Sequence, residues 1–137
     1  MLLVEDNELD VFVIRDAVDR CNLNLQLVVV TDGEGAAAYL HGLAGDNTAP
    51  CPVLILLDLN IPKISGMEVL KRIRTGMRCT HTPVIVVSSS DAASDREAAK
   101  HLGAEAYFRK PADLTAYLDL CDVIKRVLPH MSHCPDA

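Results

Sequence analysis

The sequence is poor in positive charge and has no long hydrophobic run. Its 13 Lys and Arg stand against 19 Asp and Glu, and the net charge of −6 over 137 residues argues against a nucleic-acid-binding protein. No hydrophobic stretch approaches the roughly 20 residues that a membrane-spanning helix needs. No basic segment precedes the first hydrophobic run, so we expect no secretory signal peptide and a cytoplasmic location.

Closely spaced cysteine pairs are also absent. The count is odd and no CxxC motif occurs, which argues against a zinc site and against a disulfide framework. We therefore expect reduced thiols, most of them packing as small hydrophobic residues. The five cysteines are at positions 21, 51, 79, 121 and 134.

Five short hydrophobic runs recur along the chain, and a segment with helical character follows each. Runs without polar alternation are typical of strands that helices cover on both faces. Strands that alternate with helices, joined by right-handed crossovers, predict a parallel sheet in a three-layer α/β/α domain. The runs are residues 1–4, 25–30, 53–57, 83–87 and 104–108.

Several patterns predict where the helices lie. Three capping boxes, in which a hydroxyl and a carboxylate satisfy the first turn, indicate helix starts at Thr31-x-x-Glu34, Ser65-x-x-Glu68 and Ser94-x-x-Glu97. Hydrophobic stripes at helical spacing predict one face over Met67, Leu70 and Ile73 and a longer one over Leu114, Tyr117, Leu118, Cys121, Ile124 and Leu128. Residues 41–52 are interpreted as a surface loop.

Polar side chains follow four of the predicted strands. They are Glu5 and Asp6, then Asp58, then Ser88, and finally Lys110. The carboxyl ends of parallel strands meet at one edge of a sheet, where ligands of such folds bind. Three carboxylates in one crevice repel each other unless a cation is present, and hard oxygen ligands suit Mg²⁺.

This set of side chains predicts transfer of a phosphoryl group. Asp58 is the natural nucleophile, because carboxylates form acyl phosphates when a metal and a lysine offset the charge. Lys110 supplies a compact positive charge for Asp58 or for a phosphoryl oxygen, and Ser88 can donate a hydrogen bond to another oxygen.

The motifs that contain these residues resemble the receiver domains of two-component response regulators, in order and over nearly the whole chain. The residues that follow Asp58, Asn60-Ile61-Pro62-Lys63, resemble those of the regulators that serve phytochrome-type histidine kinases. The motifs are Leu2-Leu3-Val4-Glu5-Asp6-Asn7, Leu54-Ile55-Leu56-Leu57-Asp58-Leu59-Asn60-Ile61-Pro62-Lys63, Ser65-Gly66-Met67-Glu68-Val69-Leu70, Pro83-Val84-Ile85-Val86-Val87-Ser88-Ser89 and Ala106-Tyr107-Phe108-Arg109-Lys110-Pro111.

The resemblance assigns roles to the site residues. It implies that Asp58 is the phosphoacceptor, that Ser88 and Tyr107 are the switch hydroxyl and switch aromatic, and that Lys110 binds phosphate. It also implies a cis peptide between Lys110 and Pro111. The implied Mg²⁺ ligands are the side chains of Glu5, Asp6 and Asp58 and the backbone carbonyl of Asn60.

The same resemblance implies a flavodoxin-like (βα)5 doubly wound fold with strand order 2-1-3-4-5. The chain length predicts one domain, the receiver domain at residues 1–128, and the loss of hydrophobic periodicity predicts a disordered tail at 129–137. The implied function is that of a single-domain response regulator, not an enzyme in the ordinary sense, which takes a phosphoryl group from a histidine kinase or phosphotransfer protein and signals to a protein partner. The implied homodimer face consists of the helix that begins near Ser94, the strand 104–108 and the helix over 114–128.

Three other readings remain open. A phosphorylation-independent pseudo-receiver needs no complete acidic site. An aspartyl-phosphate phosphatase needs an acid two residues after the nucleophile, where this chain has Asn60. A flavin-binding domain needs a phosphate loop that Glu5-Asp6-Asn7 does not supply. Beside the site, the consecutive hydrophobic residues Val11–Ile14 suggest a docking patch for the kinase that includes Phe12 and Val13.

Overall fold

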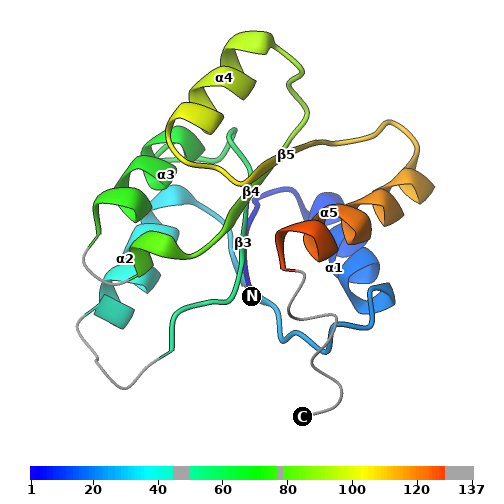
Figure 1. The fold of residues 1–137 in the computed structure, drawn as a ribbon, viewed down its shortest axis with the longest axis horizontal. Helices are drawn as coiled ribbons and strands as arrows, with labels where there is room; N and C mark the ends of the chain where they lie inside the picture. Colours follow the sequence, from blue (N-terminus) through cyan, green and yellow to red (C-terminus); the bar gives the residue numbers. More distant parts are fainter. Residues whose placement is uncertain (45–49, 77–78, 129–137) are drawn as a thin grey trace.

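The structure is a computed structural model that describes residues 1–44, 50–76 and 79–128. Within these ranges five strands form one parallel sheet in the order β2-β1-β3-β4-β5, which confirms the predicted fold (Figure 1). Nowhere in the same ranges is a helix both long enough and hydrophobic enough to cross a membrane. The predicted tail 129–137 lies outside the described residues.

The elements follow the predicted alternation of strand and helix. The strands are β1 (Leu2–Val4), β2 (Val28–Val30), β3 (Ile55–Leu57), β4 (Val84–Ser88) and β5 (Ala106–Arg109). The helices are α1 (Glu8–Arg20), α2 (Gly33–Ala44), α3 (Gly66–Thr75), α4 (Ala93–His101) and α5 (Asp119–Val127), with the 3-10 helices η1 (Cys79–His81) and η2 (Leu114–Leu118).

Two hydrophobic cores lie on opposite faces of the sheet. Alternate side chains of each strand point to opposite faces, so Leu3 and Leu56 join the core under α1 and α5, while Leu2 and Ile55 join the core under α2, α3 and α4. Figure 1 shows these two helix layers on either side of the strands. Burial on both faces explains the continuous hydrophobic runs in the sequence.

The strand register brings the carboxyl ends of the central strands to one edge. Val4 of β1 is level with Leu57 of β3, and Leu57 is level with Val86 of β4. The backbone N–H of Asp58 donates to Val4 O at 3.0 Å, and the N–H of Lys110 donates to Ser88 O at 2.8 Å. The residues that directly follow these strands therefore lie next to one another at the carboxyl edge of the sheet.

One of the three predicted capping boxes has its predicted cap. Ser65 Oγ accepts from Glu68 N at 3.2 Å and begins α3. At α2 the prediction of Thr31 is wrong, because Asp32 Oδ1 accepts the first-turn N–H of Gly35 at 2.5 Å.

The predicted cap of α4 at Ser94 is also wrong. The helix begins at Ala93, so Ser94 lies inside its first turn. Ser90 supplies the polar contacts there, since its Oγ accepts from Ala92 N at 3.2 Å and lies 2.6 Å from Asp95 Oδ2. Ala92 is the N-cap residue, so α4 begins without a side-chain cap, and the bonds of the Ser90 hydroxyl are to the N–H of Ala92 and the carboxylate of Asp95.

Two predicted boundaries shift in the structure. The loop predicted from residue 41 begins later, because α2 continues to Ala44. The predicted stripe over 114–128 is divided between η2 and α5, and the change of period leaves Leu114 and Leu118 exposed while Tyr117 and Leu120 are buried. The stripe of α3 is confirmed, with Leu70 and Ile73 buried.

The prediction of reduced thiols is wrong for four cysteines. Cys21 is bonded to Cys121, which joins the end of α1 to α5, and Cys51 is bonded to Cys79, which joins the segment before β3 to η1. The bonded cysteines are 100 and 28 residues apart in the sequence. Only the fold brings them together, so no local sequence motif predicts either disulfide. Cys134 lies outside the described residues.

Candidate functional site

Asp58 and Glu5 are buried carboxylates at the carboxyl edge of the sheet. Their exposed fractions are 4% and 1%, although each directly follows or adjoins a strand end. Asp58 Oδ1 accepts from the backbone N–H of Asn60 at 3.1 Å, and Glu5 Oε2 accepts from that of Asn7 at 3.2 Å. Buried acids are uncommon unless a partner or a metal compensates their charge, so the edge is a candidate site.

Glu5, Asp6 and Asp58 form a cluster that could hold a metal ion. One carboxylate oxygen from each lies within 4.8 Å of the others, and Asp6 is exposed while the other two are buried. Within the described ranges, Glu5 Oε1 is buried and accepts no hydrogen bond of ordinary geometry, and its near neighbour is the Lys110 ammonium at 2.8 Å. The hard oxygen donors of this cluster fit Mg²⁺.

Lys110 lies at the centre of the same edge. Its Nζ donates to Asp58 Oδ2 at 3.1 Å and to Asp10 Oδ2 at 2.8 Å. It also lies 2.8 Å from Glu5 Oε1 as an ion pair. The side chain is 11% exposed, so the ammonium is largely withdrawn from water among anions. The sequence predicted its pairing with Asp58, and the structure brings the two together.

The environment shifts the pKa values of both Glu5 and Lys110. Burial raises the pKa of Glu5 to about 7, and the charge of Asp58 adds to this effect while Lys110 opposes it. Burial by itself lowers the pKa of Lys110, but its contacts with Asp10 and Glu5 and the charge of Asp58 outweigh burial and raise it above the ordinary value. The Lys110 ammonium therefore stays charged. Its single positive charge does not balance the acids around it, so repulsion between the carboxylates still destabilises the site.

Ser88 and Tyr107 lie on β4 and β5, next to the acidic edge. Ser88 is fully buried and its Oγ accepts from Ser90 N at 3.2 Å. Tyr107 is half-buried, and its hydroxyl donates to Ser90 O at 2.8 Å. Both side chains thus contact the segment that leaves β4, which is the segment that a switch at this site would have to move.

The expected cis peptide before Pro111 is wrong, since the Lys110–Pro111 bond is trans. The trans form is intrinsically preferred by about 0.5–1 kcal/mol at proline, and the structure places the Lys110 side chain among the acids with it. Asn60 has the expected position beside Asp58, but the observed contact is made by its backbone N–H. Its carbonyl as a metal ligand stays a prediction.

Asp10 and Tyr117 are site residues that sequence reasoning missed. Asp10 is in the first turn of α1, one helical turn after Asp6, and it contacts Lys110 through one oxygen and Tyr117 Oη through the other, at 3.3 Å. One indication of this role was present in the sequence, which is the spacing of four residues between Asp6 and Asp10. An acid in a first turn is ordinarily a partner of the helix dipole, so the signal had no specificity.

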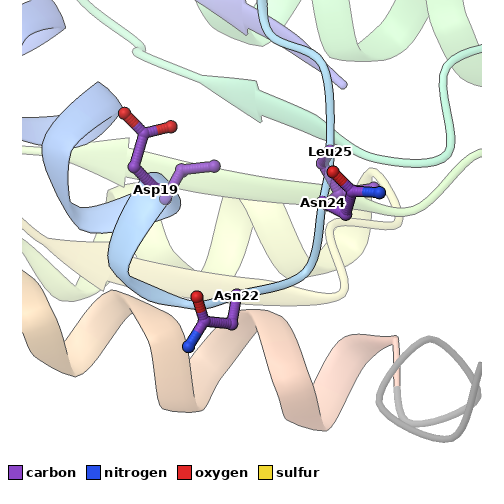
Figure 2. Close-up of a pocket in the computed structure, with 5 residues that line it drawn as sticks. Asp19, Asn22, Asn24 and Leu25 are labelled. Atoms are coloured by element: carbon purple, nitrogen blue, oxygen red, sulfur yellow. The ribbon is translucent and has the colours of Figure 1, made fainter. Parts of the chain in front are cut away.

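A hollow lies in the connection between α1 and β2, at the opposite end of α1 from Asp10. Figure 2 shows Asp19, Asn22, Asn24 and Leu25 around it, and Val18 completes the lining of a volume of about 280 Å³. Asn22 and Asn24 both have φ of 55°, a conformation that asparagine tolerates better than most residues. This hollow is next to the amino end of β2 and contains none of the predicted site residues.

The geometry of the acidic edge agrees with a comparison of the whole sequence. The family model described as response regulator receiver domain matches residues 1–122. The chain belongs to this family. Among curated receiver-domain proteins, it is 33% identical to the response regulator Rcp1 of Synechocystis sp. over 114 residues, which cover 83% of this chain and 78% of Rcp1.

Solved structures of receiver domains have the same fold. The phosphorylated cyanobacterial phytochrome response regulator RcpA superposes with a TM-score of 0.81 at 35% identity, covering 91% of this chain and 89% of RcpA. The Mn(2+)-bound form of Rcp1 superposes with a TM-score of 0.79 at 31% identity, covering 90% of this chain and 89% of Rcp1. The relatives of this chain thus include phytochrome response regulators, as its motifs suggested.

Proposed function

We propose that this protein is a response regulator whose Asp58 accepts a phosphoryl group from a histidine kinase or phosphotransfer protein in a Mg²⁺-dependent reaction. The observation that carries the proposal is the contact of Lys110 with Asp58 beside the acidic cluster. Formation of an acyl phosphate requires positive charge beside the carboxylate that is phosphorylated. Here Lys110 and a metal ion bound by the acidic cluster would supply it. The phosphorylated state of RcpA lends support from a relative.

The proposed transfer forms one bond and breaks one. A lone pair of the Asp58 carboxylate forms the O–P bond, while the P–N bond to the donor histidine breaks and its electron pair returns to the imidazole, which takes up a proton. The charge left on the phosphoryl oxygens is stabilised by Lys110. Hydrolysis later restores the carboxylate when water attacks phosphorus and inorganic phosphate departs.

Glu5, Asp6, Asp58 and the backbone carbonyl of Asn60 would hold the metal. The positive charge that bound Mg²⁺ supplies would offset the repulsion between these acids and the incoming phosphoryl group. Burial keeps Glu5 and Asp58 at the edge without freedom to turn away, which limits the reorganisation that the transfer needs.

The phosphoryl group would act on the segment after β4. Ser88 has a hydroxyl that can donate to a phosphoryl oxygen, and it now accepts from Ser90 N. A new dianion at Asp58 therefore draws the Ser88 hydroxyl toward it as a donor, and the segment bonded to Ser88 and to Tyr107 moves with it. The changed surface over β4 and α4 is the signal that a protein partner would read.

Phosphorylation is tested by incubating the full chain with phosphoramidate, with and without Mg²⁺, and weighing the intact protein. We expect a gain of one phosphoryl group that requires Mg²⁺, is abolished in Asp58→Asn and is much slower in Lys110→Ala. Asp16→Asn is the matched control, because Asp16 pairs with Arg20 on the exposed side of α1. A wild-type chain that gains no mass would overturn the proposal and favour a phosphorylation-independent interaction module.

The kinase is proposed to dock on a hydrophobic patch of α1 formed by Leu9 and Phe12. These side chains are 56% and 68% exposed, and they lie one residue before and two residues after Asp10 of the acidic site. The expectation that Val13 shares this surface is wrong, because Val13 is 8% exposed and packs in the core under α1. Large exposed side chains beside a reacting group are suited to holding a protein donor.

Docking is tested by comparing two phosphodonors. Phe12→Ala should slow phosphotransfer from the cognate kinase and leave the reaction with phosphoramidate unchanged. Val53→Ala is a control of similar kind, since Val53 is 41% exposed but lies before β3, at the opposite end of the strand from Asp58. Equal kinase rates for the wild type and Phe12→Ala would exclude Phe12 from the docking surface.

Pairing of two copies through α4, β5 and α5 is a further part of the proposed output. Tyr107 connects β5 to the segment that precedes α4, so a shift there changes this face. Light scattering over a concentration series should show a dimer that forms more readily after phosphorylation. A phosphorylated chain that stays monomeric would remove dimerisation from the proposal.

A further inference from the structure

Asp10 is a fourth carboxylate at the site, and it holds Lys110 from the side of α1. Its bond from Lys110 Nζ measures 2.8 Å, against 3.1 Å for the bond from the same atom to Asp58. Asp10 is not part of the cluster of Glu5, Asp6 and Asp58 that fits a metal ion. Its contact is with the ammonium, so its part in the chemistry differs from that of the other acids.

Two neighbours fix the position of Asp10. Its backbone N–H donates to the Asn7 side chain at 3.0 Å, which anchors the first turn of α1. Its Oδ1 accepts from Tyr117 Oη at 3.3 Å. Tyr117 is 3% exposed and its ring centroid lies 6.1 Å from that of Phe108, so the phenol is held by the core. The carboxylate is therefore a fixed acceptor and not a mobile surface group.

Each of the three N–H donors of Lys110 has a carboxyl oxygen near it in this arrangement. An ammonium has three N–H donors. Asp10, Glu5 and Asp58 each place an oxygen within 3.1 Å of Nζ. A phosphoryl group that arrives on Asp58 can gain the ammonium only by sharing it with Asp10 and Glu5. Of these two, Asp10 is the one outside the metal-binding cluster.

We propose that Asp10 is a positioning residue that competes with the phosphoryl group for Lys110, and so limits both how fast Asp58 is phosphorylated and how long the phosphoryl group persists. This inference rests on the proposed function. A hydrogen bond between two charged groups is roughly twice as strong as one between neutral groups, so the carboxylate holds the ammonium more firmly than an amide would. Removing the charge while keeping the shape frees Lys110 for the phosphoryl oxygens.

The test uses Asp10→Asn in the full chain with phosphoramidate and Mg²⁺. The rate of mass gain and the half-life of the phosphorylated form after donor removal should both rise, by about three- to tenfold, because the amide is a weaker partner for Lys110. Asp10→Glu restores the charge and should return both values toward those of the wild type. Asp16→Asn removes a charge from the same helix without touching Lys110 and should change neither.

The direction of the effect separates positioning from a structural role. A variant that merely loosened α1 would lower the thermal midpoint and reduce both the rate and the half-life. An unchanged or shorter half-life in Asp10→Asn, with the wild type phosphorylated normally, would overturn this inference alone. A wild-type chain that gains no phosphoryl group would overturn the proposed function and the inference with it.

Discussion

The Tyr107 hydroxyl donates to the backbone carbonyl of Ser90 at 2.8 Å and so joins β5 to the segment between β4 and α4. The guanidinium of Arg96 on α4 lies 4.5 Å from the centroid of the same ring. One half-buried side chain of β5 therefore contacts both the segment that follows Ser88 and helix α4. This contact holds the segment between β4 and α4 in the position that it has before phosphorylation.

We predict that Tyr107→Phe loosens the segment after β4. The loss of one half-buried hydrogen bond should lower the free energy of unfolding by about 1 kcal/mol, and amide hydrogen exchange should become faster at Ser90 and its neighbours. Urea denaturation and exchange measured by mass spectrometry check the two effects. Tyr39→Phe, on α2, is the matched control and should leave exchange at Ser90 unchanged. Equal exchange in both variants would show that the bond does not restrain the segment.

The raised pKa of Glu5 predicts a dependence of stability on pH in metal-free protein. Its pKa is about 7 in the fold against an ordinary value of 4.5, so the fold favours the protonated acid. Stability from this group is fully present below pH 4.5 and is lost as the pH rises through 7, by on the order of 1 to 3 kcal/mol. Urea denaturation between pH 4.5 and 8 in EDTA measures the loss.

Glu5→Gln should flatten the pH dependence, because the amide does not titrate. Mg²⁺ binds the ionised carboxylate, so the stabilisation that it gives should increase with pH over the same interval. A wild-type stability that rises between pH 5 and 7 by the same amount as that of Glu5→Gln would contradict the burial effect at Glu5.

We predict that Gly66→Ala disturbs the site through a backbone contact. A Cβ at Gly66 would overlap the carbonyl oxygen of Asp58 and lie 2.6 Å from Leu59 Cα, and neither backbone atom can turn aside. Unfolding free energy should fall by about 1 to 3 kcal/mol, and phosphorylation should slow because Asp58 is displaced. Denaturation and phosphoramidate kinetics are the measurements.

Gly42→Ala is the matched control for this clash. Its Cβ would have no heavy atom within 4 Å, and Gly42 lies in the exposed part of α2. Alanine should stabilise the helix by about 0.5 to 1 kcal/mol and leave phosphorylation unchanged. If Gly66→Ala were as stable and as active as Gly42→Ala, α3 would have to approach the Asp58 loop less closely than the structure has it.

The two disulfides predict unequal losses on reduction. Removing a crosslink that closes a longer loop restores more entropy to the unfolded chain, and for loops of about 100 residues the chain-entropy value is about 4.7 kcal/mol. Cys21→Ser should therefore destabilise the protein more than Cys51→Ser, because the loops span 100 and 28 residues. Urea denaturation under non-reducing conditions measures both.

Reduced wild-type protein is the reference for these variants, and it should be at least as destabilised as either. Thiol labelling of unreduced, denatured protein gives a direct check on the bonds. Modification of Cys21 or Cys121 under those conditions would show that their disulfide is not formed.

Much of the site could be predicted from the sequence because strand ends are recognisable. Continuous hydrophobic runs identified the strands, and the parallel arrangement then brought Asp58 and Lys110 to one edge without knowledge of the loops. Asp10 escaped prediction since its contact with Lys110 joins residues 100 positions apart, and an acid in a first helical turn has an ordinary local explanation.

The remaining errors also concern contacts between distant residues or the competition of near neighbours. Disulfide pairing depends on how α1 and α5 meet in space, which spacing rules do not describe. The start of α2 depends on whether Thr31 or Asp32 accepts the free N–H groups of the first turn. Both residue types cap helices well, so the sequence does not decide between them. The period of the last hydrophobic stripe changed where η2 gives way to α5.

The bond between Cys21 and Cys121 makes the two sides of the sheet mechanically unequal. While that bond is intact, it limits how far the end of α1 can separate from α5, whereas neither disulfide of the described residues involves α4. A pair of spectroscopic labels on α1 and α5 should therefore report less movement on phosphorylation than a pair that includes α4. Reduction of the Cys21–Cys121 bond should make this difference smaller.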